Sequence, residues 1–66
     1  MPCGTWITTD VPEADLPRVI FNYNLDDPIS VTQEQQADGN WTVTAKFEDC
    51  PEGQPNTTER SHSDEG

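Results

Sequence analysis

The sequence predicts a mainly β fold: a small antiparallel meander of three to four strands, with at most one short helical turn and a disordered C-terminal tail. Polar and apolar residues alternate through residues 29–35 and 41–48, as they do in strands with one buried face. Between these stretches lies Asp38-Gly39-Asn40, whose residue types tolerate the positive φ of a tight hairpin turn. No large apolar residue follows Phe47, so we expect the core to end there.

The first residues predict a short strand followed by a single helical turn. Residues 5–9 are rich in threonine and large apolar side chains, which favour strands. Asp10 is suited to cap a helix, and Pro12 to its first turn. Pro17 is expected to end this helix after about one turn, because proline removes a backbone donor and clashes with the preceding turn.

Residues 18–24 predict the next strand. Val19, Phe21 and Tyr23 would share one face of it, and Ile20 would lie on the other. Apolar side chains on both faces are typical of a central or covered strand. Pro28 then predicts a turn over residues 25–28, since proline fixes its own φ and biases the preceding residue away from helix.

The two strands on either side of Asp38-Gly39-Asn40 differ in how apolar they are. The later strand is expected to face the core with Trp41, Val43, Ala45 and Phe47. In the earlier strand, Ile29 and Val31 share a face with two glutamines. The apolar face therefore fades toward the tip of the hairpin, where polar residues are expected to reach solvent.

The composition changes at residue 51. From there on, proline, glycine, small polar residues and charges dominate, and such a segment cannot bury enough apolar surface to become ordered. We therefore predict a small antiparallel β domain over residues 1–50 and a disordered acidic tail over residues 51–66.

The charge excludes several classes of partner. Thirteen acidic side chains against three basic ones give a formal charge of −10. Direct binding to nucleic-acid phosphates depends on clustered lysines and arginines, and anionic membranes attract the same residues, so we expect neither partner. A basic protein, plain solubility and adaptation to high salt all remain open as explanations of the acidity. No apolar run is long enough for a signal peptide or a membrane-spanning helix, so the default expectation is a cytoplasmic protein.

Cys3 and Cys50 bracket the predicted domain. Joined, they would close a loop of about 48 residues and add about 4 kcal/mol in the chain-entropy model, which would help a small core. In a reducing cytosol they would instead stay free thiols. The sequence leaves both states open.

Neither catalysis nor metal binding is predicted. The two cysteines and His62 lack the closely paired spacing of zinc ligands, and no acidic pair has the spacing of a calcium loop. The one histidine falls in the predicted tail, and no glycine-rich phosphate loop occurs. We therefore expect no enzyme, no cofactor and no metal.

The predicted sheet is too small for one helical turn to cover both of its faces. An uncovered apolar patch ringed by carboxylates would be an interaction surface. Its expected residues are Trp6, Ile20, Tyr23, Asp26, Asp27 and Trp41.

These observations favour a small acidic, non-catalytic protein-binding module that docks by a sheet edge or an apolar face. One alternative is a nucleic-acid mimic, which would inhibit a basic nucleic-acid-binding protein by presenting carboxylates in place of phosphates. The other is a structural or assembly protein that forms a homodimer to complete its core.

Overall fold

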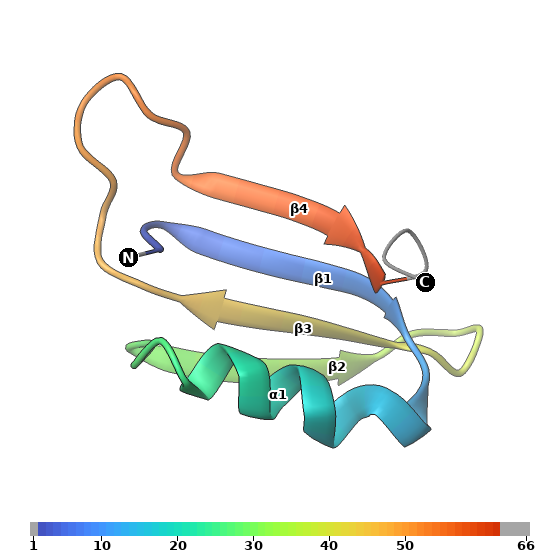
Figure 1. The fold of residues 1–66 in the computed structure, drawn as a ribbon. Helices are drawn as coiled ribbons and strands as arrows, with labels where there is room; N and C mark the ends of the chain where they lie inside the picture. Colours follow the sequence, from blue (N-terminus) through green and yellow to red (C-terminus); the bar gives the residue numbers. More distant parts are fainter. Residues whose placement is uncertain (1, 63–66) are drawn as a thin grey trace.

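The computed structural model describes residues 2–62 and contains a four-stranded sheet with one α-helix on one face (Figure 1). The strands are β1 (Thr5–Val11), β2 (Ser30–Gln35), β3 (Trp41–Lys46) and β4 (Thr57–Ser61). The helix α1 (Leu16–Asn24) follows a 3-10 turn, η1 (Glu13–Asp15). The mainly β class with four strands is therefore confirmed.

The sheet is mixed, so the predicted antiparallel meander is wrong. The strand order is β2-β3-β1-β4, with β3 antiparallel to both of its neighbours and β4 parallel to β1. β1 and β2 thus run in the same direction, and α1 lies in the crossover that such strands need. Lys46 at the end of β3 pairs with Thr5, and so does Thr57 at the start of β4. The chain therefore turns back beyond β3 and runs alongside β1.

Residues 18–24 belong to α1 and do not form the predicted strand. The apolar residues of this stretch fit both the two-residue period of a strand and the 3.6-residue period of a helix. In the structure Leu16, Val19 and Tyr23 are all buried, at the i, i+3, i+7 spacing of a helix. Pro17 lies at the start of this helix and does not end an earlier one. A proline is tolerated there because the first N–H groups of a helix have no intrahelical partner. The helix is nine residues long, so it exceeds the single turn predicted.

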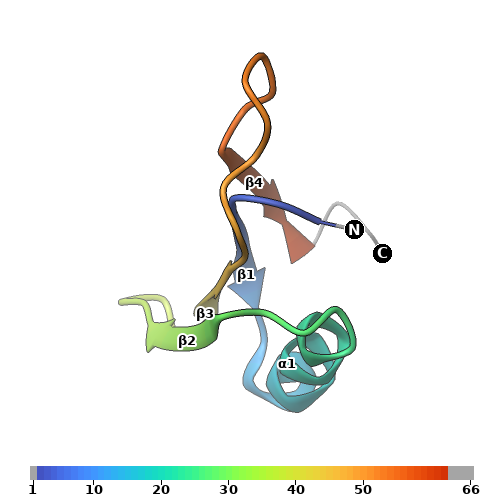
Figure 2. The same cartoon turned by 90° about the vertical axis from the view of Figure 1, so that its left-hand side faces the viewer.

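α1 lies over the side of the sheet formed by β2 and β3, while β4 is at the far edge (Figures 1 and 2). The core between α1 and the sheet consists of seven buried side chains: Val11, Leu16, Val19, Tyr23, Val43, Ala45 and Phe47. Four partly buried residues pack against it: Trp6, Ile20, Val31 and Trp41. The side chains predicted to face the core from β3 do so, and Phe47 continues their alternation beyond the strand.

An irregularity in β1 brings Val11 into the core. Thr8 pairs with Val43, but Val11 pairs with Trp41, so three steps along β1 match two along β3. Asp10, inside this bulge, has a φ of 57°. An extra residue reverses the alternation of a strand, so Val11 shares the inner face with Thr8 and is fully buried.

Part of the predicted tail belongs to the sheet. Residues 57–61 form β4, and they pair with β1 from Thr5↔Thr57 to Thr9↔Ser61. The predicted end of the ordered domain at residue 50 is corrected accordingly. A strand at the edge of a sheet gains its backbone hydrogen bonds from its neighbour and so does not require large apolar side chains. Residues 63–66 of the predicted tail lie outside the described residues.

The start of β1 is fastened to the loop that follows β3. Cys3 and Cys50 are joined by a disulfide. The Thr5 N–H donates to the backbone oxygen of Asn56 at 2.6 Å, and the Cys50 N–H donates to the Asn56 side-chain oxygen at 2.8 Å. Gly4 has a φ of +76°, and a Cβ added there would overlap the Asn56 carbonyl. This crossing therefore requires glycine.

Candidate functional site

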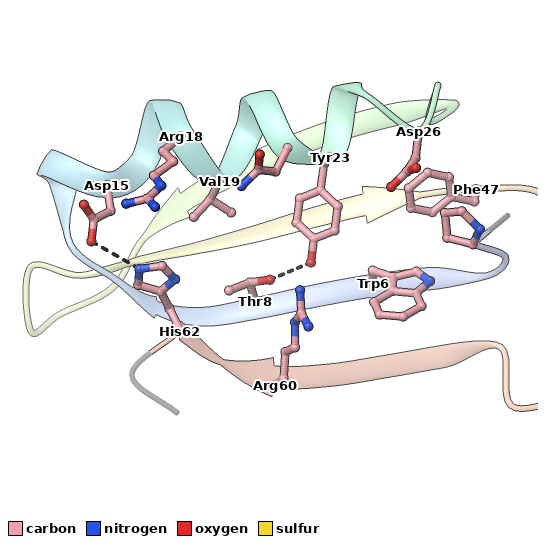
Figure 3. Close-up of a pocket in the computed structure, with 12 residues that line it drawn as sticks. Trp6, Thr8, Asp15, Arg18, Val19, Tyr23, Asp26, Phe47, Arg60 and His62 are labelled. Carbon is pink, nitrogen blue, oxygen red and sulfur yellow. Dashed lines mark hydrogen bonds and ion pairs between the residues drawn. The ribbon is translucent and has the colours of Figure 1, made fainter. Parts of the chain in front are cut away.

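The main hollow of the described chain is a cleft between α1 and β4 that lies over β1 (Figure 3). Its volume is about 590 Å³, within the roughly 300–1,000 Å³ of small-molecule sites. Because α1 lies over β2 and β3, the inner face of β1 beside β4 is left open to form the floor. The lining residues used below are Trp6, Thr8, Asp15, Arg18, Tyr23, Asp26, Phe47, Arg60 and His62.

The middle of the cleft contains a hydrogen bond between sheet and helix. The hydroxyl oxygens of Thr8 and Tyr23 lie 2.5 Å apart, and both residues are buried. Only 2% of the surface of Thr8 is exposed. This bond joins β1 to α1 beneath the cleft.

Two arginines line this cleft. Arg18 comes from the first turn of α1 and Arg60 from β4, and both guanidinium groups point into the hollow (Figure 3). Arg60 lies 5.8 Å from the centre of the Trp6 ring, a cation–π distance. The remaining basic residue of the chain, Lys46, alternates with the inward-facing Ala45 and therefore lies on the other face of the sheet. Two of the three basic side chains thus line one site.

The two ends of the cleft carry carboxylates. At one end, His62 Nε2 lies 3.1 Å from Asp15 Oδ2, which links the end of β4 to the start of α1. At the other end, Asp26 lies close to Phe47 (Figure 3). The guanidinium groups therefore lie between two acidic ends.

A second, smaller hollow of about 360 Å³ lies where α1 and β3 end. Four carboxylates line it, from Asp26, Asp27, Glu48 and Asp49, and Ile29 and Phe47 lie among them. We call these four side chains the acidic rim. No group of histidine, cysteine or acidic side chains within residues 2–62 is arranged to hold a metal ion.

Three large apolar side chains in the stretch of chain that contains Asp26 and Asp27 are exposed to solvent. Phe21, Leu25 and Ile29 have 62%, 67% and 65% of their surface accessible. Phe21 and Leu25 are one helical turn apart and lie on the side of α1 opposite Val19 and Tyr23. We call these three residues the apolar patch.

Of the six residues predicted to form one interaction surface, the structure brings Trp6, Tyr23 and Asp26 together in the lining of the cleft. Asp27 belongs to the acidic rim. Tyr23 lies in the core with 8% of its surface exposed, because the helix turns it inward. The other two, Ile20 and Trp41, pack against the core.

Neither the apolar patch nor the two arginines of the cleft are predicted from the sequence. The alternation of residues 18–24 predicts Phe21 on a covered strand, whereas Phe21 lies on the exposed side of α1. The composition of the chain from residue 51 onward predicts a tail that includes Arg60 and His62, although Thr57 and Thr58 give a weak strand signal. Residues from opposite ends of the chain meet here only because β4 pairs with β1.

Comparison with known proteins gives no family. No protein-family model, curated protein or solved structure matches the chain. Within residues 2–62, no helix is long and apolar enough to cross a lipid bilayer. The function must therefore be argued from the chain's own residues.

Proposed function

We propose that this protein is a small acidic, non-catalytic binding module that docks on another protein through its apolar patch. The observation that carries the proposal is the exposure of Phe21, Leu25 and Ile29, each more than three-fifths accessible within nine consecutive residues. None of these three side chains belongs to the core cluster of seven buried residues within residues 2–62. Exposed apolar groups rimmed by charges are typical of protein interfaces.

The acidic rim supports a basic partner. Asp26 and Asp27 lie between Leu25 and Ile29 in the chain, and Glu48 and Asp49 line the same hollow as Ile29. A matching surface would have an apolar centre surrounded by lysines and arginines. The carboxylates would speed and orient the encounter, while apolar burial would hold the complex together.

The test compares capture by matched variants of the immobilised protein, from a lysate of the source organism. Phe21→Gln/Leu25→Gln removes the centre of the apolar patch, and Ser30→Gln/Thr32→Gln makes equivalent changes at exposed positions on the opposite face of the sheet. We expect a set of basic proteins captured by the wild type and by the control pair, and lost with the patch variant. Retention of the whole set by the patch variant would overturn the proposal.

A second variant separates the role of charge. Asp26→Asn/Asp27→Asn/Glu48→Gln/Asp49→Asn neutralises the acidic rim, and asparagine tolerates the positive φ of Asp27. This variant should associate more slowly than wild type at low salt and similarly at high salt, because salt screens charge. Capture that depends on the rim but not on the patch would instead support a nucleic-acid mimic. Self-association that the patch variant abolishes would support a homodimer.

A further inference from the structure

The cleft between α1 and β4 is separate from the proposed docking patch. Leu25 and Ile29 do not line it, and neither does Phe21. Its walls come from the inner side of β1, the edge strand β4 and the flank of α1. An occupant of this cleft would therefore leave the apolar patch exposed.

The cleft has an apolar part that suits a flat ring. Trp6, Tyr23 and Phe47 contribute aromatic surface to the lining. The Trp6 indole N–H donates to the Cys3 carbonyl oxygen at 3.0 Å, which fixes the orientation of that ring. Pre-oriented aromatic side chains with a few polar groups are typical of small-molecule sites.

The cleft also has a part that suits an anion. Arg18 and Arg60 enter it from opposite walls, and the hydroxyl groups of Thr8 and Tyr23 lie between those walls (Figure 3). Guanidinium groups form paired hydrogen bonds with carboxylates. The chain carries thirteen acidic residues and only three basic ones, so two arginines in one hollow contrast with the rest of the surface.

We propose that this cleft binds a small organic acid whose carboxylate is attached to a flat apolar ring. The carboxylate lies between Arg18 and Arg60, and the ring lies toward Trp6 and Phe47. Asp15 at one end and Asp26 at the other confine the anion to the middle of the cleft. The site is formed only when β4 has joined the sheet, because Arg60 belongs to that strand.

The test uses 2-naphthoate as the probe and 2-naphthylmethanol as its neutral counterpart. Titration is followed by two-dimensional ¹H–¹⁵N NMR of the full chain. We expect 2-naphthoate to shift the Trp6 indole signal and the amides of Thr8 and Arg60, and to leave Gly39 at the β2–β3 turn unchanged. The alcohol should bind roughly tenfold more weakly, because it lacks the charge that both arginines recognise.

Three variants identify the anion site. Arg18→Gln and Arg60→Gln should each weaken 2-naphthoate binding by roughly tenfold. Lys46→Gln makes the same change of charge on the other face of the sheet and should leave the affinity unchanged. An unchanged dispersion of amide signals confirms that each variant is folded.

Any of the following outcomes would overturn the proposal. They are equal affinity for the acid and the alcohol, equal loss of affinity in the Lys46 and arginine variants, and shifts confined to residues outside the cleft. An absence of shifts at millimolar 2-naphthoate would do the same. None of these results affects the docking proposal, which depends on the apolar patch.

Discussion

Thr8 on β1 and Tyr23 on α1 form a buried hydrogen bond of 2.5 Å that connects the sheet to the helix covering it. Only 2% of the surface of Thr8 and 8% of that of Tyr23 is exposed. A buried polar group that loses its partner costs more than the bond itself contributed. The pair therefore helps to fix where α1 lies on the sheet.

Replacing Tyr23 with phenylalanine should lower the free energy of unfolding by about 1–2 kcal/mol, because the Thr8 hydroxyl then stays buried without this bond. Urea unfolding followed by tryptophan fluorescence measures the change. Thr8→Val in the same background should cost less than it does alone, since no partner remains to be lost. Strictly additive costs would show that the two hydroxyls do not interact.

Gly4→Ala should weaken the attachment of β4. The new Cβ would overlap the Asn56 carbonyl, whereas Gly53, which also has a positive φ, has nothing within 4 Å of an added Cβ. We expect Gly53→Ala to lower the free energy of unfolding by about 1–2 kcal/mol through backbone conformation alone. Gly4→Ala should lower it by more. Hydrogen exchange of the β4 amides should accelerate in the Gly4 variant and not in the Gly53 variant. Equal costs would contradict the close approach of Gly4 to Asn56.

Replacing both Cys3 and Cys50 with serine should lower the free energy of unfolding by about 4 kcal/mol, because the unfolded chain regains the freedom of a long loop. The two cysteines are 47 positions apart. Urea midpoints of the wild type with and without reductant provide the measurement. The reduced wild type should match the variant, and reductant should leave the variant unchanged. An equal midpoint for oxidised wild type and variant would exclude a stabilising disulfide.

Val19→Gln and Phe21→Gln distinguish the helix from the strand predicted for the same residues. On a strand these two side chains share a face, but on α1 Val19 is buried and Phe21 is exposed. Val19→Gln should therefore lower the free energy of unfolding by about 2 kcal/mol or more, because it buries an amide among apolar groups. The free energy of unfolding of Phe21→Gln should stay within about 0.5 kcal/mol of the wild-type value. Thermal unfolding by circular dichroism separates the two cases, and equal losses would contradict the helix.

The strands on either side of Asp38-Gly39-Asn40 lie within the predicted ranges, because local alternation and local turn chemistry act together there. Residues 18–24 show the limit of that reasoning. Their apolar residues satisfy both a two-residue and a helical period, and only packing of Val19 and Tyr23 against β3 decides between them. The sequence predicts that Pro17 ends a helix, because a proline can either end a helix or occupy its first turn, and the local sequence does not distinguish the two.

The cleft could not be predicted, since its walls come from residues distant in sequence. Thr8, Arg18 and Arg60 meet only when β4 lies beside β1 and α1 crosses the opposite half of the sheet. Apart from the weak strand signal of Thr57 and Thr58, the composition of residues 51–62 does not indicate that pairing, because an edge strand depends mainly on backbone hydrogen bonds. Charge counting indicated where the chain is acidic overall, but not that its few arginines converge.

The parallel pairing of β1 with β4 has a consequence for the order of folding. Thr5 pairs with Thr57, which lies nearly at the other end of the described chain, whereas β2 and β3 are joined by a short turn. Contacts between distant residues form only after the entropy of closing a long loop has been overcome. We therefore expect β2 and β3 to associate early and β4 to join last, so that Gly4→Ala accelerates unfolding more than it slows folding in stopped-flow experiments. The strand that completes the cleft is then also the first part of the sheet to detach.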